Sequence, residues 1–426
     1  MSRPEFQPGG VLPDGTAPRP SRMVRTFRAF TYRDYRLLWA GAFTSSVGTW
    51  MQEVAQNWLI LTMTGSAFLL GLDAFLGDAP FLAFSLFGGV LADRVDRRRI
   101  LLTSQFVQLS SAFLLAGLIW GHAIQVWTIL TLSFVVGFAQ SFGGPAYQAL
   151  VPTLVDKPDL PNAVALNSIQ FNLARIIGPV LAGLAFYKFG AAACFALNGV
   201  SFLAVIAALF SLKRGALESG GEKAEPFRES LKAGLRAVRD GTALRGLIGL
   251  AFVGSFCAMP LVTFLPVFAQ KVFHRDAKGY ATLLAAFGIG AVVGAVGIAG
   301  FGHVRRKGML AVAMQSAFGL LMIAFAVSRN PAVSYAILFA AGAALMIVFA
   351  MFMTLVQANV EDRLRGRVVS VYTLAFRGAM PLGNLAAGAL ASWLTAPKVL
   401  ILDGIVLVLM GAVVLARHRT AGVTSL

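Results

Sequence analysis

The chain has 426 residues, of which 57% are hydrophobic and only 13% charged, and its mean hydropathy is +0.74. Soluble domains carry about 45–50% apolar and about 25% charged residues, so the composition argues against a soluble globular protein, a disordered chain, a disulfide scaffold and a collagen-like fibre. The formal net charge of +17 would suggest a nucleic-acid partner in a soluble protein. In so apolar a chain, the first question is where the positive charges lie.

The N-terminal segment carries no long apolar run in its first 36 residues, so we expect no cleavable signal peptide. Residues 1–22 are rich in proline and glycine, which predicts a disordered tail. Aromatic residues from Phe27 to Tyr35 are mixed with arginines. This mixture predicts an amphipathic lead-in helix at the membrane surface.

Twelve stretches are apolar over the roughly 20 residues that a helix needs to cross a bilayer. They lie near 37–61, 67–91, 100–120, 124–145, 162–186, 191–212, 246–269, 279–300, 309–327, 332–354, 368–393 and 398–416. The longest connection runs from Lys213 to Arg245 and divides the spans six and six. The sequence therefore predicts an all-α integral membrane protein with twelve transmembrane helices in two six-helix halves.

This division gives five segments along the chain. They are a cytosolic tail and lead-in helix (1–36), an N-terminal half (37–212), a cytosolic linker with an amphipathic helix (213–245), a C-terminal half (246–416) and a cytosolic C-terminal tail (417–426).

The positive charges are distributed unequally between the two sides of the membrane. If the N-terminus is cytosolic, 28 of the 36 Lys and Arg residues fall on the cytosolic side, 6 on the other side and 2 within spans. By the positive-inside rule both termini are then cytosolic. The net charge is thus explained by topology, and a nucleic-acid partner is not expected.

The linker contains a candidate amphipathic helix. Its apolar face has Phe227, Leu231, Leu235 and Val238 at helical spacing; its basic face has Arg228, Lys232, Arg236 and Arg239. Such a helix is expected to lie on the inner leaflet. It is either a coupling element between the halves or a simple tether with solvated charges.

The two halves resemble each other weakly in sequence. Leu150-Val151-Pro152 and Leu355-Val356-Gln357 follow equivalent spans and are 205 residues apart. We also expect Arg175-x-x-x-Pro179 to correspond to Arg377-x-x-x-Pro381, with both prolines bending their helices. Two halves related in this way are typical of secondary transporters, which bind substrate between the halves at mid-membrane.

The loop between spans 2 and 3 carries the most specific motif, Gly88-Gly89-Val90-Leu91-Ala92-Asp93-Arg94-Val95-Asp96-Arg97-Arg98-Arg99. It resembles the G-x-x-x-D-R-x-x-R-R signature of the major facilitator superfamily. The resemblance implies a cytosolic gate made by Gly89, Asp93, Arg94, Arg97 and Arg98. Gly89 would allow close helix approach, and Asp93 would face the positive N-terminal end of span 11. An ordinary positively charged loop is the alternative.

Two further motifs resemble the drug:proton antiporter-3 branch, which includes macrolide-efflux and enterobactin-exporter-like proteins. They are Gly48-Thr49-Trp50-Met51-Gln52 and Arg175-Ile176-Ile177-Gly178-Pro179-x-x-Ala182-Gly183, where the resemblance implies that Gly178, Pro179 and Gly183 belong to a helix-bending motif. One position departs from the pattern. Ser133 stands where many drug/proton antiporters carry an arginine, so a proton relay through that arginine cannot be transferred.

Acidic residues inside spans are costly, which makes them functional candidates. Glu53 and Asp78 fall near mid-membrane, with Asp73 further out, and Asp403 lies near the end of the last span. The protonation of a buried carboxyl responds to its burial and to neighbouring charge, so Glu53, Asp78 and Asp73 are proton-coupling candidates. A neutral hydrogen-bonded carboxyl, or a fixed ion pair with Arg175, is the alternative.

Other polar and aromatic residues could line the substrate site. These candidates are Trp50, Gln52, Asn57, Gln140, Asn172, Arg175 and Arg377.

We therefore predict a secondary active transporter that exports amphipathic drugs or macrolide-like compounds in exchange for protons. Siderophore export on the same fold, or proton-independent uptake or lipid movement, are the alternatives. The sequence carries no catalytic triad, HExxH motif or P-loop, so an enzyme is not expected, nor is a metal or cofactor. Expected partners are a small-molecule substrate, protons and the cell-membrane bilayer, with the monomer as the functional unit.

Overall fold

The computed structural model describes residues 27–213, 227–300 and 307–421, without the side chains of 85–94, 227–231, 299–300 and 417–421. The part of the chain so described is helical and contains no strand. The long helices are α2 (Arg33–Thr64), α3 (Ala67–Arg94), α4 (Arg97–Trp120), α5 (Val126–Leu150), α6 (Leu160–Ser211), α7 (Phe227–Asp240), α8 (Thr242–Val267), α9 (Ala277–Gly300), α10 (Lys307–Val327), α11 (Pro331–Ala358), α12 (Arg365–Trp393) and α13 (Ala396–Ala421). The short elements are the 3-10 helices η1 (Arg28–Thr31), η2 (Val151–Leu154) and η3 (Lys157–Asp159) and the π-helical turn η5 (Phe268–Val272).

Twelve membrane spans can be identified among these helices. Nine of the described segments are long and apolar enough to cross a bilayer. One of them, Lys157–Ser211, holds two spans that meet at Gly190, where φ is 76° and ψ is −178°. A side chain is strongly disfavoured at this backbone conformation, so glycine allows the break. The more polar helices α2 and α12 complete the twelve, which confirms the predicted span count.

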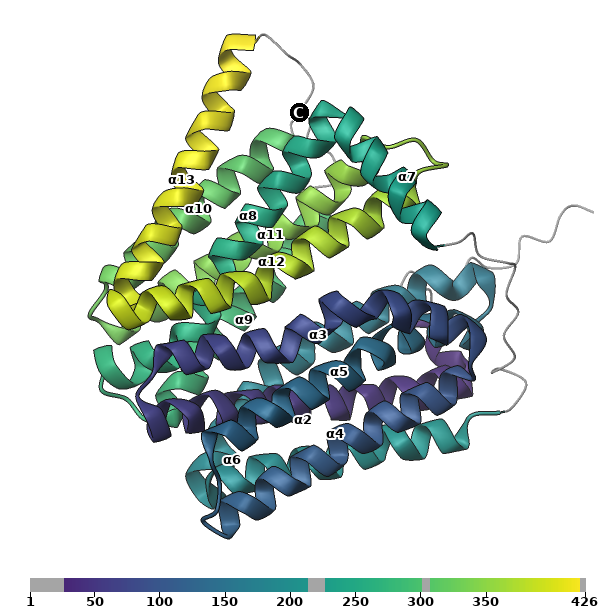
Figure 1. Ribbon diagram of the computed structural model, residues 1–426, viewed down its shortest axis with the longest axis vertical. Coiled ribbons are helices and arrows are strands. Elements are labelled where there is room, and N and C mark those ends of the chain that lie inside the picture. Colours follow the sequence, from purple (N-terminus) through teal and green to yellow (C-terminus); the bar gives the residue numbers. More distant parts are fainter. Residues whose placement is uncertain (1–26, 214–226, 301–306, 422–426) are drawn as a thin grey trace, which may run out of the picture.

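The spans form two groups, one from each half of the chain, and these groups pack against each other (Figure 1). In the N-terminal half, α2 and α4 both pack on α6, and α3 packs on α5. In the C-terminal half, α8 packs on α12, α9 packs on α11 and α10 packs on α13. Across the halves, α3 packs against α12 and α6 against α9. We call the end of the bundle that carries α7 the α7 end, and the other the opposite end.

The internal repeat is structural, and its register is 205 residues. Gly137 of α5 and Gly342 of α11 are 205 apart, and an added Cβ at either would overlap backbone of the neighbouring span, α3 or α9. Gly178 and Gly383 form a second such pair, closely packed on α2 and α8. The two halves are therefore pseudo-symmetric, as predicted.

This register changes one predicted correspondence. Arg175 and Arg377 are only 202 residues apart, so the repeat pairs Arg377 with Asn172 instead. Three residues of helix are about 4.5 Å along its axis. The two arginines therefore lie at different depths in their halves. Pro179 and Pro381 are also 202 residues apart, so the 205-residue register does not pair them. Each proline lies inside a continuous helical segment.

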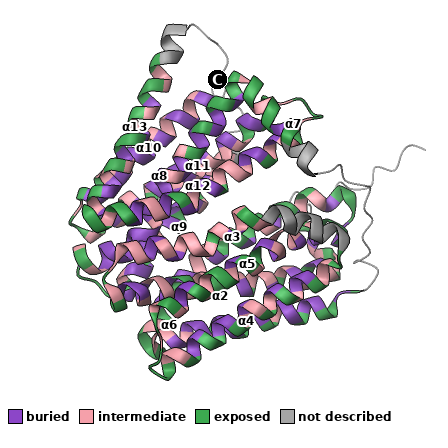
Figure 2. Cartoon of the chain, viewed as in Figure 1, coloured by how far each residue is buried: buried purple, intermediate pink, exposed green. Residues whose placement is uncertain are grey.

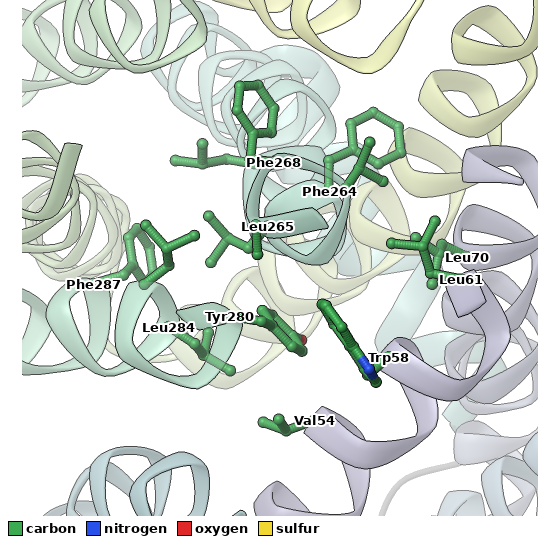
Figure 3. Close-up of a cluster of buried hydrophobic side chains, with 14 of the residues drawn as sticks. Val54, Trp58, Leu61, Leu70, Phe264, Leu265, Phe268, Tyr280, Leu284 and Phe287 are labelled. Carbon is green, nitrogen blue, oxygen red and sulfur yellow. The ribbon is translucent and has the colours of Figure 1, made fainter. Parts of the chain in front are cut away.

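The halves share a buried apolar core at the opposite end alone. One cluster joins Val54, Trp58 and Leu61 of α2 to Leu265 of α8 and Tyr280 of α9 (Figure 3). At the α7 end, two other clusters lie entirely within the N-terminal half and the C-terminal half, respectively. The described core thus fastens the two halves together at one end and leaves them with separate cores at the other.

Exposed residues lie along the outer faces of the helices (Figure 2), and many of them are large and apolar. Aromatic residues mark the opposite end: Trp120 ends α4, Trp127 begins α5 and Trp393 ends α12, and all three are exposed. Such a belt is typical of residues at a membrane–water interface. The chain is thus a multi-pass membrane protein.

The lead-in segment differs from the predicted amphipathic helix. It is a single 3-10 turn, η1, and α2 begins at Arg33. The Ala29 amide donates to Asn162 Oδ1 at 2.9 Å, and Arg28 Nε lies 3.2 Å from Asp159 Oδ1. The Tyr32 hydroxyl donates to Asp159, and this hydrogen bond is the main reason that the pKa of Tyr32 rises to about 12. The lead-in is therefore docked on the connection that precedes α6.

The linker helix α7 forms where it was predicted, but one of its residues faces the other way. α7 packs against α12 and α8. Val238 is half-buried, as expected for the apolar face, whereas Leu235 is 50% exposed. The side chains of Phe227, Arg228 and Leu231 lie outside the described residues.

The Gly137 contact yields a stability prediction. Gly137→Ala would force a methyl group into the Gly77 carbonyl oxygen, so we expect it to lower the free energy of unfolding by about 1–3 kcal/mol. The thermal midpoint in detergent measures this loss. Gly117→Ala is the matched control, because an added Cβ there meets nothing within 4 Å and alanine favours a helix. Equal midpoints for the two variants would contradict the close packing of α3 on α5.

Candidate functional site

An aromatic pair from the two halves closes the space between them at the opposite end. The rings of Trp58 in α2 and Tyr280 in α9 are stacked with centroids 6.4 Å apart, and both side chains are buried. Asn57 Nδ2 donates to the Tyr280 hydroxyl at 3.4 Å. Further out, Lys271 Nζ donates to the Gly65 carbonyl at 2.7 Å. Stacked rings within an apolar cluster exclude water from this end.

Two predicted acids, Glu53 of α2 and Asp78 of α3, are close enough to interact electrostatically. Glu53 interacts electrostatically with Asp78, Arg175, Asp73 and Tyr280, and Asp78 interacts with Arg377 and Asp73. These partners come from α3, α6, α9 and α12, so the acids point toward the boundary between the halves and away from lipid. Both are nevertheless exposed to solvent. Among the described residues, neither accepts a hydrogen bond or forms an ion pair.

The two predicted arginines, Arg175 and Arg377, contact aromatic rings of the other half. The guanidinium carbon of Arg175 lies 5.4 Å from the Phe287 ring centroid in α9 and 5.4 Å from that of Trp50. The guanidinium carbon of Arg377 lies 4.7 Å from the Phe81 ring centroid in α3. Arg175 Nε is buried and has no hydrogen-bond partner. Each cation is therefore held mainly by rings, at a distance suited to cation–π attraction.

These four side chains form one electrostatic array across the boundary. Each neighbouring pair interacts in the order Arg175, Glu53, Asp78, Arg377. The two central carboxylates repel each other, and a proton or a cationic group taken up there would relieve that repulsion. The flanking arginines can in turn attract an anionic group. The array is suited to exchanging small charged species.

Asp73, the third predicted acid, lies in a different environment. It is 5% exposed and accepts hydrogen bonds from Ser133 Oγ at 2.6 Å and Gln56 Nε2 at 2.8 Å. All three residues belong to the N-terminal half. Ser133, the position noted for lacking the arginine of many drug/proton antiporters, therefore satisfies Asp73 with a neutral donor.

The other predicted substrate residues differ in where they point. Trp50 and Asn57 contact the boundary between the halves, through Arg175 and Tyr280. Gln52 accepts from Asn198 Nδ2 at 2.7 Å, and Gln140 accepts from Gln108 Nε2 at 3.3 Å, both within the N-terminal half. The Asn172 amide donates to the Ser168 carbonyl of its own helix.

Gly178 and Gly183, which were predicted as part of a helix-bending motif, lie at close contacts between helices. At Gly178 an added Cβ would lie 2.9 Å from the Val47 carbonyl oxygen of α2. At Gly183 it would lie 3.2 Å from Ala281 Cβ of α9, in the other half. Small residues thus bring α6 close to both neighbours.

The predicted gate motif is described in part. Gly89, Asp93 and Arg94 lie in the part of α3 for which the structure describes the backbone alone. Arg97 donates to the Ala149 carbonyl at 3.1 Å, and Arg98 donates to the Phe210 carbonyl at 3.2 Å and covers the Phe210 ring. These two bonds join the start of α4 to the ends of α5 and α6.

Sequence reasoning missed three aromatic partners from the opposing half: Tyr280, Phe287 and Phe81. Phe81 and Phe287 carry no distinguishing signal in a chain with 34 phenylalanines. Tyr280 does carry one, because a buried tyrosine near the start of a span usually finds a polar partner.

Comparison with known proteins gives consistent results. A family model described as "transmembrane secretion effector" matches residues 24–424. Macrolide efflux protein A of Streptococcus pyogenes is 22% identical over 397 residues, which cover 90% of this chain and 96% of that protein. The staphyloferrin A transporter of Staphylococcus aureus is 24% identical, covering 82% and 87% of the two chains. The multidrug efflux pump Tap of Mycolicibacterium fortuitum is 27% identical, covering 83% and 88%.

Solved structures share the fold at lower identity. The nucleoside transporter NupG superposes with a TM-score of 0.72 at 12% identity, covering 91% of this chain and 99% of that one. A bacterial homologue of the human lysosomal transporter Spinster, in an inward-facing and unoccupied conformation, gives 0.70 at 15% identity, covering 95% and 98%. The predicted major facilitator fold is confirmed.

The Trp58–Tyr280 contact generates a labelling prediction. In a chain whose two native cysteines are replaced by alanine, Val54→Cys places a buried thiol one turn from Trp58. Adding Tyr280→Ala opens the apolar seal, so we expect a membrane-impermeant maleimide applied at the opposite end to label this thiol faster. Tyr187→Ala is the control, because Tyr187 is 78% exposed and lies outside the seal. An unchanged rate with Tyr280→Ala would contradict the seal.

Proposed function

The chain belongs to the transmembrane secretion effector family of the major facilitator superfamily, and on this premise we propose that it exports amphipathic small molecules across the cell membrane in exchange for protons. The observation that carries the proposal is the pair Glu53 and Asp78. Both are solvent-exposed carboxyls within spans, at the boundary between the halves, and neither has an ion-pair partner in the described structure. An intramembrane acid kept accessible in this way is suited to carrying protons.

We further propose that the α7 end faces the cytosol and that this conformation is inward-facing. The distribution of Lys and Arg supports the orientation, because 28 of 36 fall on that side. The shared core and the Trp58–Tyr280 stack at the opposite end support a closed outer side. Substrate would then enter from the cytosol and reach the array from the α7 end.

The exchange follows from the electrostatics of the array. In the outward-facing state, protons would reach Glu53 and Asp78 and remove their mutual repulsion, which favours substrate release. In the inward-facing state, proton loss would restore the charges for the next substrate. Arg175 and Arg377, held against rings of the other half, would follow the relative movement of the halves. We propose the monomer as the functional unit, because both halves contribute to one array.

Coupling is tested with Glu53→Gln and Asp78→Asn. A neutral amide cannot carry the proton, so we expect each variant to lose export driven by an imposed pH gradient in everted vesicles. Asp73→Asn is the matched control, since Asp73 is already satisfied by Ser133 and Gln56. It should retain the pH-gradient dependence. If Glu53→Gln and Asp78→Asn both keep that dependence, the coupling site lies elsewhere.

A siderophore or another carboxylate-bearing compound is the second candidate substrate. It is favoured by the two arginines, because neither forms an ion pair in the described structure and Arg175 Nε is buried without a partner. The name of the staphyloferrin A transporter among the relatives agrees with this alternative.

Arg175→Gln and Arg377→Gln distinguish the two candidates. A charge-assisted hydrogen bond contributes about 1.5–3 kcal/mol, so losing one should weaken binding of a carboxylate substrate by about tenfold or more. Binding of a cationic amine should change little. Affinities of the purified variants for a matched carboxylate and amine series measure this difference. Equal losses for both series would exclude a specific carboxylate site.

A further inference from the structure

Helix α7 presents a cationic stripe to its surroundings. Lys232, Leu235, Arg236 and Arg239 follow the i, i+3, i+4, i+7 spacing of one helix face, and all four are exposed. Arg239 lies 3.4 Å from the exposed carboxylate of Asp240, its chain neighbour. Lys232 and Arg236 form no ion pair in the described structure. The stripe is therefore a positively charged surface in which Arg239 is paired with Asp240 and an exposed leucine lies among the cations.

The opposite face of α7 is fixed to the bundle by a contact that repeats one in the N-terminal half. At Gly234 an added Cβ would lie 2.7 Å from the Arg367 carbonyl at the start of α12. In the N-terminal half, Ala29 hydrogen-bonds Asn162 near the start of α6. Gly234 and Arg367 lie 205 residues after Ala29 and Asn162, which is the register of the repeat. α7 and η1 are thus equivalent lead-in elements.

The two lead-in elements differ in how their charge is compensated. Arg28 of η1 pairs with Asp159, and the Tyr32 hydroxyl donates to Asp156 and Asp159. At the positions equivalent to Asp156 and Asp159 the C-terminal half has Glu361 and Leu364, so one of the two acids is absent. Arg28 of η1 is therefore paired within its own half, whereas Lys232 and Arg236 of α7 have no ion-pair partner among the side chains that the structure describes.

Chain connectivity places the stripe at the membrane surface. Gly241 alone separates α7 from α8, and α8 has buried apolar residues from Leu244 onward. A helix of 14 residues joined so closely to a span cannot leave the headgroup region, because it is also packed on the start of α12. An exposed leucine among basic residues is typical of helices that lie in the interface.

We propose that the α7 stripe is a binding surface for anionic phospholipid headgroups in the leaflet at the α7 end. Lys232, Arg236 and Arg239 would contact the phosphate and glycerol-phosphate groups, and Leu235 would insert among the upper acyl carbons. Clusters of basic residues on an interfacial helix attract anionic lipid in this way. The proposal is independent of the transported substrate and of proton coupling.

Native mass spectrometry of the purified full-length chain tests the proposal. The chain is titrated with phosphatidylglycerol and, separately, with phosphatidylcholine of the same acyl length. We expect a preference for phosphatidylglycerol that the triple variant K232Q/R236Q/R239Q loses. Each basic residue contributes about fivefold near an anionic surface, so the triple change should weaken phosphatidylglycerol binding by about a hundredfold.

A matched control has the same change of charge elsewhere at the same end. The triple variant R36Q/K157Q/K213Q removes three exposed cations of the N-terminal half and should keep the preference. Unchanged thermal midpoints show that both variants are folded. The proposal is overturned if the α7 variant binds phosphatidylglycerol as the parent does, or if the control variant loses as much.

Discussion

The apolar cluster around Trp58 and Tyr280 holds the two halves together at one end of the bundle. Each half has its own buried core at the α7 end, so among the described residues this cluster alone buries apolar side chains from both halves. Tyr280 is 1% exposed, and its ring stacks on Trp58 while its hydroxyl meets Asn57. The arrangement of the charged array depends on this cluster, because it sets how α2 and α9 approach each other. Phe287, whose ring lies against the guanidinium of Arg175, belongs to the same cluster.

Much of the architecture could be predicted from the sequence, since a span depends on local composition. The twelve spans and the even division into halves follow from hydropathy and loop lengths. The acids Glu53 and Asp78 stood out for a similar reason, as carboxyls within apolar runs. Both acids interact electrostatically with an arginine, Glu53 with Arg175 and Asp78 with Arg377, while their role in proton coupling stays a prediction.

The features that the sequence could not predict depend on which helices, far apart in the sequence, contact each other in the fold. The correspondence of Arg175 with Arg377 rested on a short sequence likeness, whereas glycine contacts in the structure fix the register at 205 residues. Asp73 looked like the other acids until its neutral partners Ser133 and Gln56 were placed around it. Leu235 was assigned to the packed face of α7 because helical spacing alone does not reveal which side meets α12. The partner of Asp93 is a prediction still, since its side chain lies outside the described residues.

The crossing of α3 and α12 has a mechanical consequence. An added Cβ at Gly388 would lie 3.2 Å from Gly71 Cα and 3.2 Å from the Phe68 carbonyl oxygen, so backbone meets backbone at this point. Helices that meet through larger side chains interlock as ridges in grooves, and turning them requires those side chains to disengage. Gly71 and Gly388 have no side chains that could interlock at this point. One half can therefore tilt against the other about this crossing, which would move the aromatic cluster at the opposite end and the helices at the α7 end relative to each other.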